Sequence, residues 1–216
     1  LTSEQRDAYY RFLADGLGPD REAVIAAATR YIADPGPASL ARLQRAVDSP
    51  RQEYFRRLNF APGATRALVD LRKDMLARRE RIAGLGLVEE DLMHLLFSWF
   101  NRGFLVLRSI DWNTPAAILE KIIAYEAVHE IQSWDDLRRR LDPADRHCFA
   151  FFHPSLGDDP LIFVEVALTD TVPGNIQGLL DGRPKGRAAT APAKPKVAVF
   201  YSISNCQEGL RGISFG

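Results

Sequence analysis

The sequence predicts two structural domains: an all-helical bundle over residues 1–145 and an α+β domain over residues 146–216. Two observations predict this division. Apolar residues recur three and four positions apart through most of the first part, which is the spacing of amphipathic helices. From Cys148 onward, short runs rich in β-branched and aromatic residues replace that spacing, as is typical of strands. We therefore expect the helices to form one domain and the strands to begin a second.

The composition excludes several classes of protein. The chain has 216 residues with 28 Lys and Arg and 28 Asp and Glu, so its formal net charge is zero. A sequence-independent nucleic-acid-binding protein would need a basic excess. No apolar run approaches the roughly 20 residues of a membrane span. Cys148 and Cys206 have no CxxC spacing, which argues against a disulfide framework or a metal site. We expect a cytoplasmic protein with no nucleic-acid or membrane partner.

Capping residues and proline mark the helices of the first domain. Asp20 is placed to cap the helix Arg21–Asp34, and Ser133 to cap Trp134–Leu141. The clearest helix, Ala64–Ile82, has apolar residues on one side and arginines opposite, which we expect to be solvated; phosphate binding is the alternative. The other expected helices are the segment with Tyr9, Phe12 and Leu13, Ala38–Val47, Arg51–Leu58, Val88–Phe100 and Ala116–Tyr125.

One helical stretch is apolar nearly all round. Leu92–Phe100 has the sequence LMHLLFSWF, and a helix of that kind is buried within a bundle or between subunits. We expect His94, inside it, to be a core histidine with a hydrogen-bond partner.

The second domain is predicted to contain strands Cys148–His153 and Leu161–Thr169, joined as a hairpin by a seven-residue irregular loop. A short helix, Asn175–Leu180, follows. Residues 181–196 are rich in Pro, Ala, Gly and Lys without apolar periodicity, so we expect a mobile surface excursion. A third strand, Val197–Ser204, comes next, so the excursion lies inside the domain.

The end of the chain combines features of an anion-binding site. The strand Val197–Ser204 runs into a turn with Gly209, Gly212 and Gly216, where missing side chains let a ligand approach the backbone. Glycine-spaced N–H groups at a helix N-terminus are suited to a pyrophosphate. The chain ends where that helix should begin, so we expect the sequence to be a fragment.

The last six residues resemble a known phosphate-binding pattern. Arg211-Gly212-Ile213-Ser214-Phe215-Gly216 is similar to the (Arg/Gln)-x-x-Gly-x-(Gly/Ala) loop of the GCN5-related N-acetyltransferase (GNAT) fold, with Ser214 where that fold usually has glycine. The resemblance implies that Arg211, Gly212 and Gly216 face the pyrophosphate of coenzyme A, where charge-assisted contacts are favourable.

A longer resemblance covers most of the chain and is strongest from about Trp99 onward. It rests on four segments that resemble malonyl-CoA decarboxylases: YEAVHEIQSWDDLRRRL, FFHPSLGDDPLIFVEVALTD, PGNIQGLL and FYSISNCQEGLRGISFG. The resemblance implies an N-terminal helical domain used in homo-oligomerisation and a C-terminal GNAT-like catalytic domain, here truncated at its coenzyme A loop. It also implies conversion of malonyl-CoA to acetyl-CoA and carbon dioxide without a metal or organic cofactor.

The same resemblance suggests the catalytic residues. Loss of carbon dioxide leaves an enolate on the thioester, which needs hydrogen-bond donors and then a proton. Backbone N–H groups between Asn205 and Gly212 are candidates for the donors, and a serine–histidine pair for the proton transfer. The family's serine corresponds to Ser204 or Ser202; we favour Ser204, nearer the strand end. The catalytic histidine is expected beyond Gly216.

A second segment is expected to contact the acyl group. Gly174, Asn175, Ile176 and Gln177 match the family's loop-to-helix segment that contacts malonyl-CoA. Asn175 stands at a helix start, so it either orients the acyl group or caps the helix.

Two other functions remain open. One is a GNAT-type N-acetyltransferase that transfers acetyl to an amine. The other is a catalytically inactive coenzyme A-binding domain beside a helical interaction module.

Overall fold

The computed structural model describes residues 1–180 and 195–214. It divides into two compact units, one formed by Leu1–Asn101 with Gly209–Gly216, the other by Arg102–Glu208. The second unit is continuous in sequence, whereas the first is completed by the segment that follows it. Residues 181–194 of the predicted excursion, and Phe215 and Gly216 of the predicted pyrophosphate loop, lie outside the described residues.

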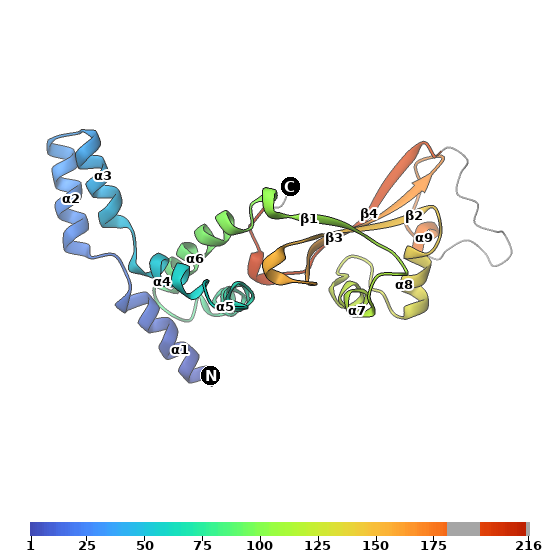
Figure 1. The fold of residues 1–216 in the computed structure, drawn as a ribbon, viewed down its shortest axis with the longest axis horizontal. Coiled ribbons are helices and arrows are strands. Elements are labelled where there is room, and N and C mark those ends of the chain that lie inside the picture. The colour runs from blue at the N-terminus through green and yellow to red at the C-terminus, as the bar shows by residue number, and fades with distance from the viewer. Residues whose placement is uncertain (181–194, 215–216) are drawn as a thin grey trace. The chain divides into compact units, whose positions relative to one another are not determined.

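The first unit is helical in the described residues (Figure 1). Helices α2 and α3 lie side by side as a hairpin, and the Asp20 carboxylate accepts the N–H groups of Glu22 and Ala23, which confirms the predicted cap. A short π-helical turn, Phe12–Gly16, extends the first helix. The helix bounds are α1 Ser3–Arg11, α2 Arg21–Ala33, α3 Pro37–Val47, α4 Pro50–Leu58, α5 Ala64–Arg78 and α6 Leu85–Trp99.

Helix α6 is buried on one side only. Leu92, Leu95 and Leu96 are at most 4% exposed, whereas Phe97 is 54% exposed. His94 is also exposed. The prediction of a core histidine is therefore wrong for this chain, because an apolar composition does not by itself determine which sides of a helix have packing partners. Burial of this helix between subunits, the other alternative, stays a prediction.

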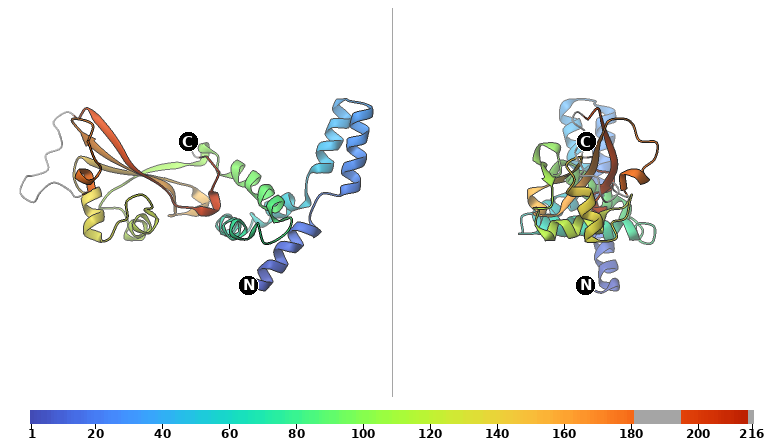
Figure 2. Two further views of the ribbon diagram at one scale, coloured as in Figure 1. Left: turned by 180° about the vertical axis from the view of Figure 1, so that it is seen from behind. Right: turned by 90° about the vertical axis from the view of Figure 1, so that its right-hand side faces the viewer.

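The described residues of the second unit form an antiparallel sheet with strand order β1-β2-β3-β4 (Figures 1 and 2). The predicted hairpin between the second and third strands is confirmed. The element bounds are β1 Val106–Ile110, α7 Ala116–Tyr125, α8 Trp134–Leu141, β2 Arg146–Phe152, β3 Pro160–Thr169, α9 Gln177–Leu180 and β4 Val197–Asn205.

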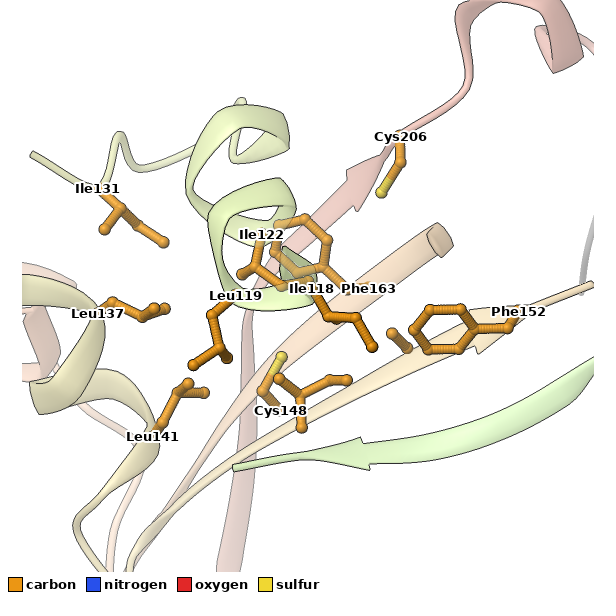
Figure 3. Packing of buried hydrophobic residues seen from close by; sticks show 12 residues of the cluster. Ile118, Leu119, Ile122, Ile131, Leu137, Leu141, Cys148, Phe152, Phe163 and Cys206 are labelled. Atoms are coloured by element: carbon orange, nitrogen blue, oxygen red, sulfur yellow. The ribbon is translucent and has the colours of Figure 1, made fainter. Parts of the chain in front are cut away.

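Helices α7 and α8 cover one face of this sheet, and their apolar side chains form its core (Figure 3). Ile122 and Leu137 come from the two helices, and Phe163 from the sheet; all three are fully buried. The helix bounds agree with those predicted, since caps and helical spacing are local signals. The alternation along β2 fits the same packing, because its even-numbered positions from Arg146 to Phe152 are all buried.

The sheet begins earlier in the chain than the sequence predicts. Strand β1 pairs with β2, from Val106 opposite Phe152 to Ile110 opposite Cys148, and lies within the stretch expected to be helical. It is five residues long and mostly exposed, so it carries little of the apolar alternation that reveals strands. The division between the two units accordingly falls between residues 101 and 102, whereas the sequence predicts it at about residue 145.

No helix in the described part of the chain is long and apolar enough to cross a membrane.

Candidate functional site

Strand β4 carries Ser202 and Ser204 on the same face of the sheet, because side chains two positions apart on a strand point the same way. Their partners across the ladder are Glu165 and Phe163 of β3. Phe163 belongs to the core under α7 and α8, so the serines lie on the covered face. Ser202 is 2% exposed and Ser204 is 1% exposed. Buried hydroxyls at such positions require hydrogen-bond partners.

Both hydroxyls find the same partner, Glu126, the residue that follows the last turn of α7. The Ser202 Oγ donates to Glu126 and lies 2.8 Å from each carboxylate oxygen. The Ser204 Oγ donates to Oε2 at 3.1 Å. The backbone N–H groups of Val128 and His129 donate to Oε1 at 2.8 and 2.7 Å. A carboxylate only accepts hydrogen bonds. All four donors therefore converge on one buried acceptor.

The two serines are not equivalent in this arrangement. Ser202 is equidistant from both oxygens of Glu126, whereas Ser204 makes one longer bond. Ser204 Oγ also accepts the Ala127 N–H at 3.3 Å, and the two hydroxyl oxygens are 3.5 Å apart. Ser204 is thus the more weakly held hydroxyl of the pair.

Arg140 of α8 fixes the loop that carries Glu126. Its guanidinium donates to the carbonyl oxygens of His129 at 2.8 Å and Glu130 at 3.2 Å. It also pairs with Asp136 at 3.3 Å and with Glu165 of β3 at 3.2 Å. Arg140 is 4% exposed, so these partners compensate its buried charge. The planar fork of arginine suits such simultaneous contacts on the helix, the strand and the loop.

Glu165 lies next to this site with an altered acidity. Burial raises the pKa of Glu165 to about 7, although Arg140 acts in the opposite direction. Its Oε1 atom has no hydrogen-bond partner in the described residues, and the same is true of the buried Tyr201 hydroxyl. Burial also raises the pKa of Tyr201. The surroundings of Glu165 and Tyr201 therefore favour the protonated forms of both groups.

The predicted acyl-contact segment lies at another place in the same unit. Gly174 and Asn175 line a cavity of about 410 Å³ near the end of β3. Thr169, which also lines it, is six residues along β3 from the partner of Ser204, or roughly 20 Å. Ile176 and Gln177 do not line the cavity. The other lining residues are Asp145, Arg146, Leu168, Asp170, Thr171, Pro173, Gly178 and Leu179.

The Asn175 side chain has a structural role. Its Oδ1 accepts the N–H of Gly178 at 3.1 Å, which fits the capping alternative. In this structure the segment from Gly174 to Gln177 and the serines are separate features.

The terminal segment, Gly209–Gly216, belongs to the helical unit. Gly209 is buried, Arg211 is exposed, and Gly212 has φ +85°, in the left-handed region that favours glycine. This segment follows β4 directly through Cys206 and Gln207, as predicted.

Sequence reasoning did not find Glu126 or Arg140. Glu126 is 76 residues from Ser202 in the chain, and a single glutamate after a helix has no distinguishing pattern. Arg140 is the buried member of a run of three arginines. The helical spacing of Leu137 and Leu141 could have indicated that Arg140 lies on the buried side of the helix. No group of three or more His, Cys, Asp or Glu side chains suited to a metal ion occurs in residues 1–180 and 195–214.

Comparison with known sequences gives the family. The sequence model of the malonyl-CoA decarboxylase N-terminal domain matches residues 17–100. That of the malonyl-CoA decarboxylase C-terminal domain matches residues 103–216, more than half of the chain. The chain belongs to the malonyl-CoA decarboxylase family. The two matched regions meet between residues 100 and 103, close to the division between the structural units.

Relatives within the malonyl-CoA decarboxylase family include animal proteins. The mitochondrial malonyl-CoA decarboxylase of Rattus norvegicus is 36% identical over 179 residues, which are 81% of this chain and 36% of the rat protein. That of Anser anser anser is 36% identical over 173 residues, 78% of this chain and 34% of the goose protein. The chain thus spans about a third of the length of these relatives.

Solved malonyl-CoA decarboxylase structures have the same fold. That from Rhodopseudomonas palustris matches with a TM-score of 0.89 and 51% identity, covering 100% of this chain and 52% of that one. That from Agrobacterium vitis matches with a TM-score of 0.91 and 51% identity, with the same coverage. The predicted resemblance to this family is confirmed.

Proposed function

We propose that the full-length protein carrying this chain converts malonyl-CoA to acetyl-CoA and carbon dioxide. The observation that carries the proposal is the buried group formed by Ser202 and Ser204 of β4 with Glu126 after α7, in a chain of the malonyl-CoA decarboxylase family. A hydroxyl held against a carboxylate is a group whose proton can be redirected, which is what a proton-transfer step requires.

The reaction breaks the bond between the thioester's α-carbon and the leaving carboxylate. The electron pair moves into a thioester enolate, carbon dioxide leaves, and a proton then adds to the α-carbon. Backbone N–H groups after β4 are the candidates for stabilising the enolate oxygen. Ser204, paired with the histidine expected beyond Gly216, passes the proton. Donors that are fixed before the substrate arrives need no reorganisation during the reaction.

The unequal contacts of the serines support Ser204 as the reacting residue. A hydroxyl has one proton, so Ser204 has to turn from Glu126 to reach a substrate. It gives up a single bond of 3.1 Å, and Glu126 keeps Ser202 and two backbone N–H groups. Ser202 would have to leave both carboxylate oxygens. Ser202 and Glu126 then act as the support that holds Ser204 in place.

Assignment of the second unit to the GNAT fold is part of the same proposal. An antiparallel sheet whose last strand runs into the glycine turn Arg211–Gly216 is the arrangement that this assignment needs. Coenzyme A would then lie against Arg211, Gly212 and Gly216. The acyl contact expected of Gly174, Asn175, Ile176 and Gln177 is not part of this proposal, because the cavity beside that segment lies roughly 20 Å along β3 from the partner of Ser204. Measuring the Kd of the Arg211→Ala variant for coenzyme A tests the assignment of Arg211 to the pyrophosphate. We expect the Kd to rise, and an unchanged Kd would contradict the assignment.

The decisive experiment is incubation of the full-length protein with malonyl-CoA and no acceptor, with acetyl-CoA and carbon dioxide as readouts. We expect Ser204→Ala to lower kcat by about 10²–10⁴-fold, the contribution typical of a positioned proton-transfer group. Ser202→Ala and Glu126→Gln should lower kcat less, because each loosens Ser204 without removing it. Ser155→Ala is the control, since Ser155 is exposed. A parallel incubation with acetyl-CoA and an amine tests the acetyltransferase alternative, which acetyl transfer there and no carbon dioxide from malonyl-CoA would favour. Coenzyme A binding without turnover in either incubation would favour the inactive module.

The resemblance also implies a homo-oligomer formed through the helical unit and a reaction without a metal or organic cofactor. The exposed ring of Phe97 on α6 supports the oligomer, because a second copy of the chain would cover it. This ring lines a cavity of about 380 Å³ together with Met93, His94, Ser98 and Asn101. Light scattering on the full-length protein tests the oligomer, and a monomer would contradict it. Dialysis against EDTA should leave the rate unchanged.

The cytoplasmic location expected from the composition stays a prediction. The rat and goose relatives are named as mitochondrial proteins. Cell fractionation with antibodies against the full-length protein distinguishes the two compartments.

A further inference from the structure

We propose that Arg72 and Glu89 of the helical unit form a clamp that positions the start of the coenzyme A loop. The clamp holds the carbonyl groups of Gly209 and Arg211 and thereby orients the backbone N–H groups that face the pyrophosphate. This inference rests on the proposed function, which assigns Arg211–Gly216 to coenzyme A. It gives the helical unit a part in substrate binding, in addition to any part in assembly.

Arg72 lies in the middle of α5 and is only 2% exposed. One of its nitrogens, Nη1, donates to the carbonyl oxygen of Gly209 at 2.7 Å and to that of Arg211 at 2.8 Å. The expectation that the arginines of this helix lie on a solvated face is wrong for Arg72. A charged group buried at this depth needs full compensation, which the terminal segment supplies in part.

Glu89 of α6 completes the compensation. Its Oε1 accepts from Arg72 Nε at 2.8 Å and lies 2.7 Å from Arg72 Nη2. Glu89 is itself 3% exposed. Nε and Nη2 of the guanidinium therefore contact Glu89, and Nη1 contacts the terminal segment. The planar guanidinium of arginine can donate in both directions at once.

The backbone of the terminal segment is in direct contact with α5. A Cβ atom at Gly209 would lie 1.9 Å from the carbonyl oxygen of Val69, one turn before Arg72. Only glycine allows this approach. Gly212, with φ +85°, then turns the chain out of the clamp. The hydrogen bonds from Arg72 and the close approach to Val69 thus both hold the backbone from Gly209 to Arg211.

The clamp has a consequence for the N–H groups of the loop. In a trans peptide the C=O and the following N–H point in opposite directions. With the carbonyls of Gly209 and Arg211 held toward Arg72, the N–H groups of Leu210 and Gly212 are directed away from it. Gly212 is one of the residues assigned to the pyrophosphate. Fixing its N–H before binding removes part of the ordering cost that a flexible loop would incur.

The charges of Arg72 and Glu89 cancel, so the effect on the ligand is orientation and not long-range attraction. Loss of the clamp should therefore weaken coenzyme A binding by a factor that changes little with salt. Loss of a phosphate-binding cation would instead reduce the salt dependence itself.

The test uses the full-length protein with coenzyme A and malonyl-CoA as probes. We expect Arg72→Met to raise the Kd for coenzyme A and the KM for malonyl-CoA at least tenfold, with kcat within threefold of wild type. Hydrogen exchange of residues 209–214 should become faster while that of β4 is unchanged. Arg72→Lys should restore binding only in part, because one ammonium cannot reproduce the fork. Arg57→Met is the control, since Arg57 forms an exposed pair with Glu53.

Arg72→Met leaves Glu89 buried without its partner, so a second variant guards against simple misfolding. Arg72→Met/Glu89→Leu removes both charges, and apolar replacement of a buried pair is often tolerated. It should fold and still bind coenzyme A weakly. Wild-type affinity and unchanged exchange in this variant would overturn the clamp alone. A wild-type protein that binds no coenzyme A would overturn the proposed function together with it.

Discussion

Replacement of Gly209 by alanine should destabilise the helical unit strongly. The added Cβ would lie 1.9 Å from Val69 O, and ordinary contact begins at 3.4 Å, so the terminal segment must move by about 1.5 Å. A shift of that size breaks both hydrogen bonds from Arg72, which are 2.7 and 2.8 Å long. Hydrogen bonds to a charged group contribute about 1.5–3 kcal/mol each, so we expect the free energy of unfolding to fall by at least about 3 kcal/mol.

Urea denaturation followed by circular dichroism measures this loss. The matched control is Gly86→Ala inside α6, where the nearest atom to the added Cβ is Arg79 Nη2 at 3.9 Å. Alanine in a helix is more favourable than glycine by up to about 1 kcal/mol, so the control should be as stable as wild type or slightly more stable. A Gly209→Ala variant within about 0.5 kcal/mol of wild type would refute the reasoning, because surface-like substitutions fall in that range.

Three further predictions concern the sheet unit. The pKa of Glu165 is about 7 in the folded protein, against 4.5 for an ordinary glutamate. Because the unfolded chain gives up this proton at lower pH than the folded protein does, the free energy of unfolding falls as the pH rises from 4.5 to 7. Glu165→Gln should therefore gain about 3 kcal/mol on wild type between pH 4.5 and pH 8 in urea denaturation, and a pH-independent difference would contradict this. Phe163→Ala should cost about 3–5 kcal/mol, against a small effect for Ile203→Ala, which is 54% exposed; equal effects would show that Phe163 is not in the core. Burial raises the thiol pKa of Cys148 and Cys206, so iodoacetamide at pH 8 should label them only in urea; labelling of the native protein would show that the core opens.

The elements predicted best from sequence are those with local signals. The bounds of α7 and α8 match the predicted helices Ala116–Tyr125 and Trp134–Leu141, and Ser133 accepts the N–H of Asp136 as a cap. Strand β4 was predicted to within one residue because β-branched and aromatic residues fill it. Strand β1 was not predicted, since five mostly exposed residues need a neighbouring strand to define them.

The candidate site was predictable only in part, and for a related reason. The strand placed Ser202 and Ser204 on one face, but strand alternation contains no information on what covers that face. Glu126 comes from 76 residues away, and nothing in its surroundings distinguishes it from the other glutamates. Arg72 shows the same limit: helical spacing assigned it to the charged side, and its partners lie 137 and 139 residues later.

The discontinuous make-up of the helical unit has a consequence for how the protein folds. Arg72 and Glu89 are 17 residues apart, whereas Arg72 and Gly209 are 137 apart. By the logarithmic dependence of loop closure on length, the second contact costs about 1.8 kcal/mol more entropy than the first. During synthesis, α5 and α6 leave the ribosome before Gly209 and Arg211, whose carbonyl oxygens accept hydrogen bonds from the Arg72 side chain. Residues 102–208 of the sheet unit are synthesised in between. The helical unit can therefore be completed only after residues 102–208 of the sheet unit have been synthesised.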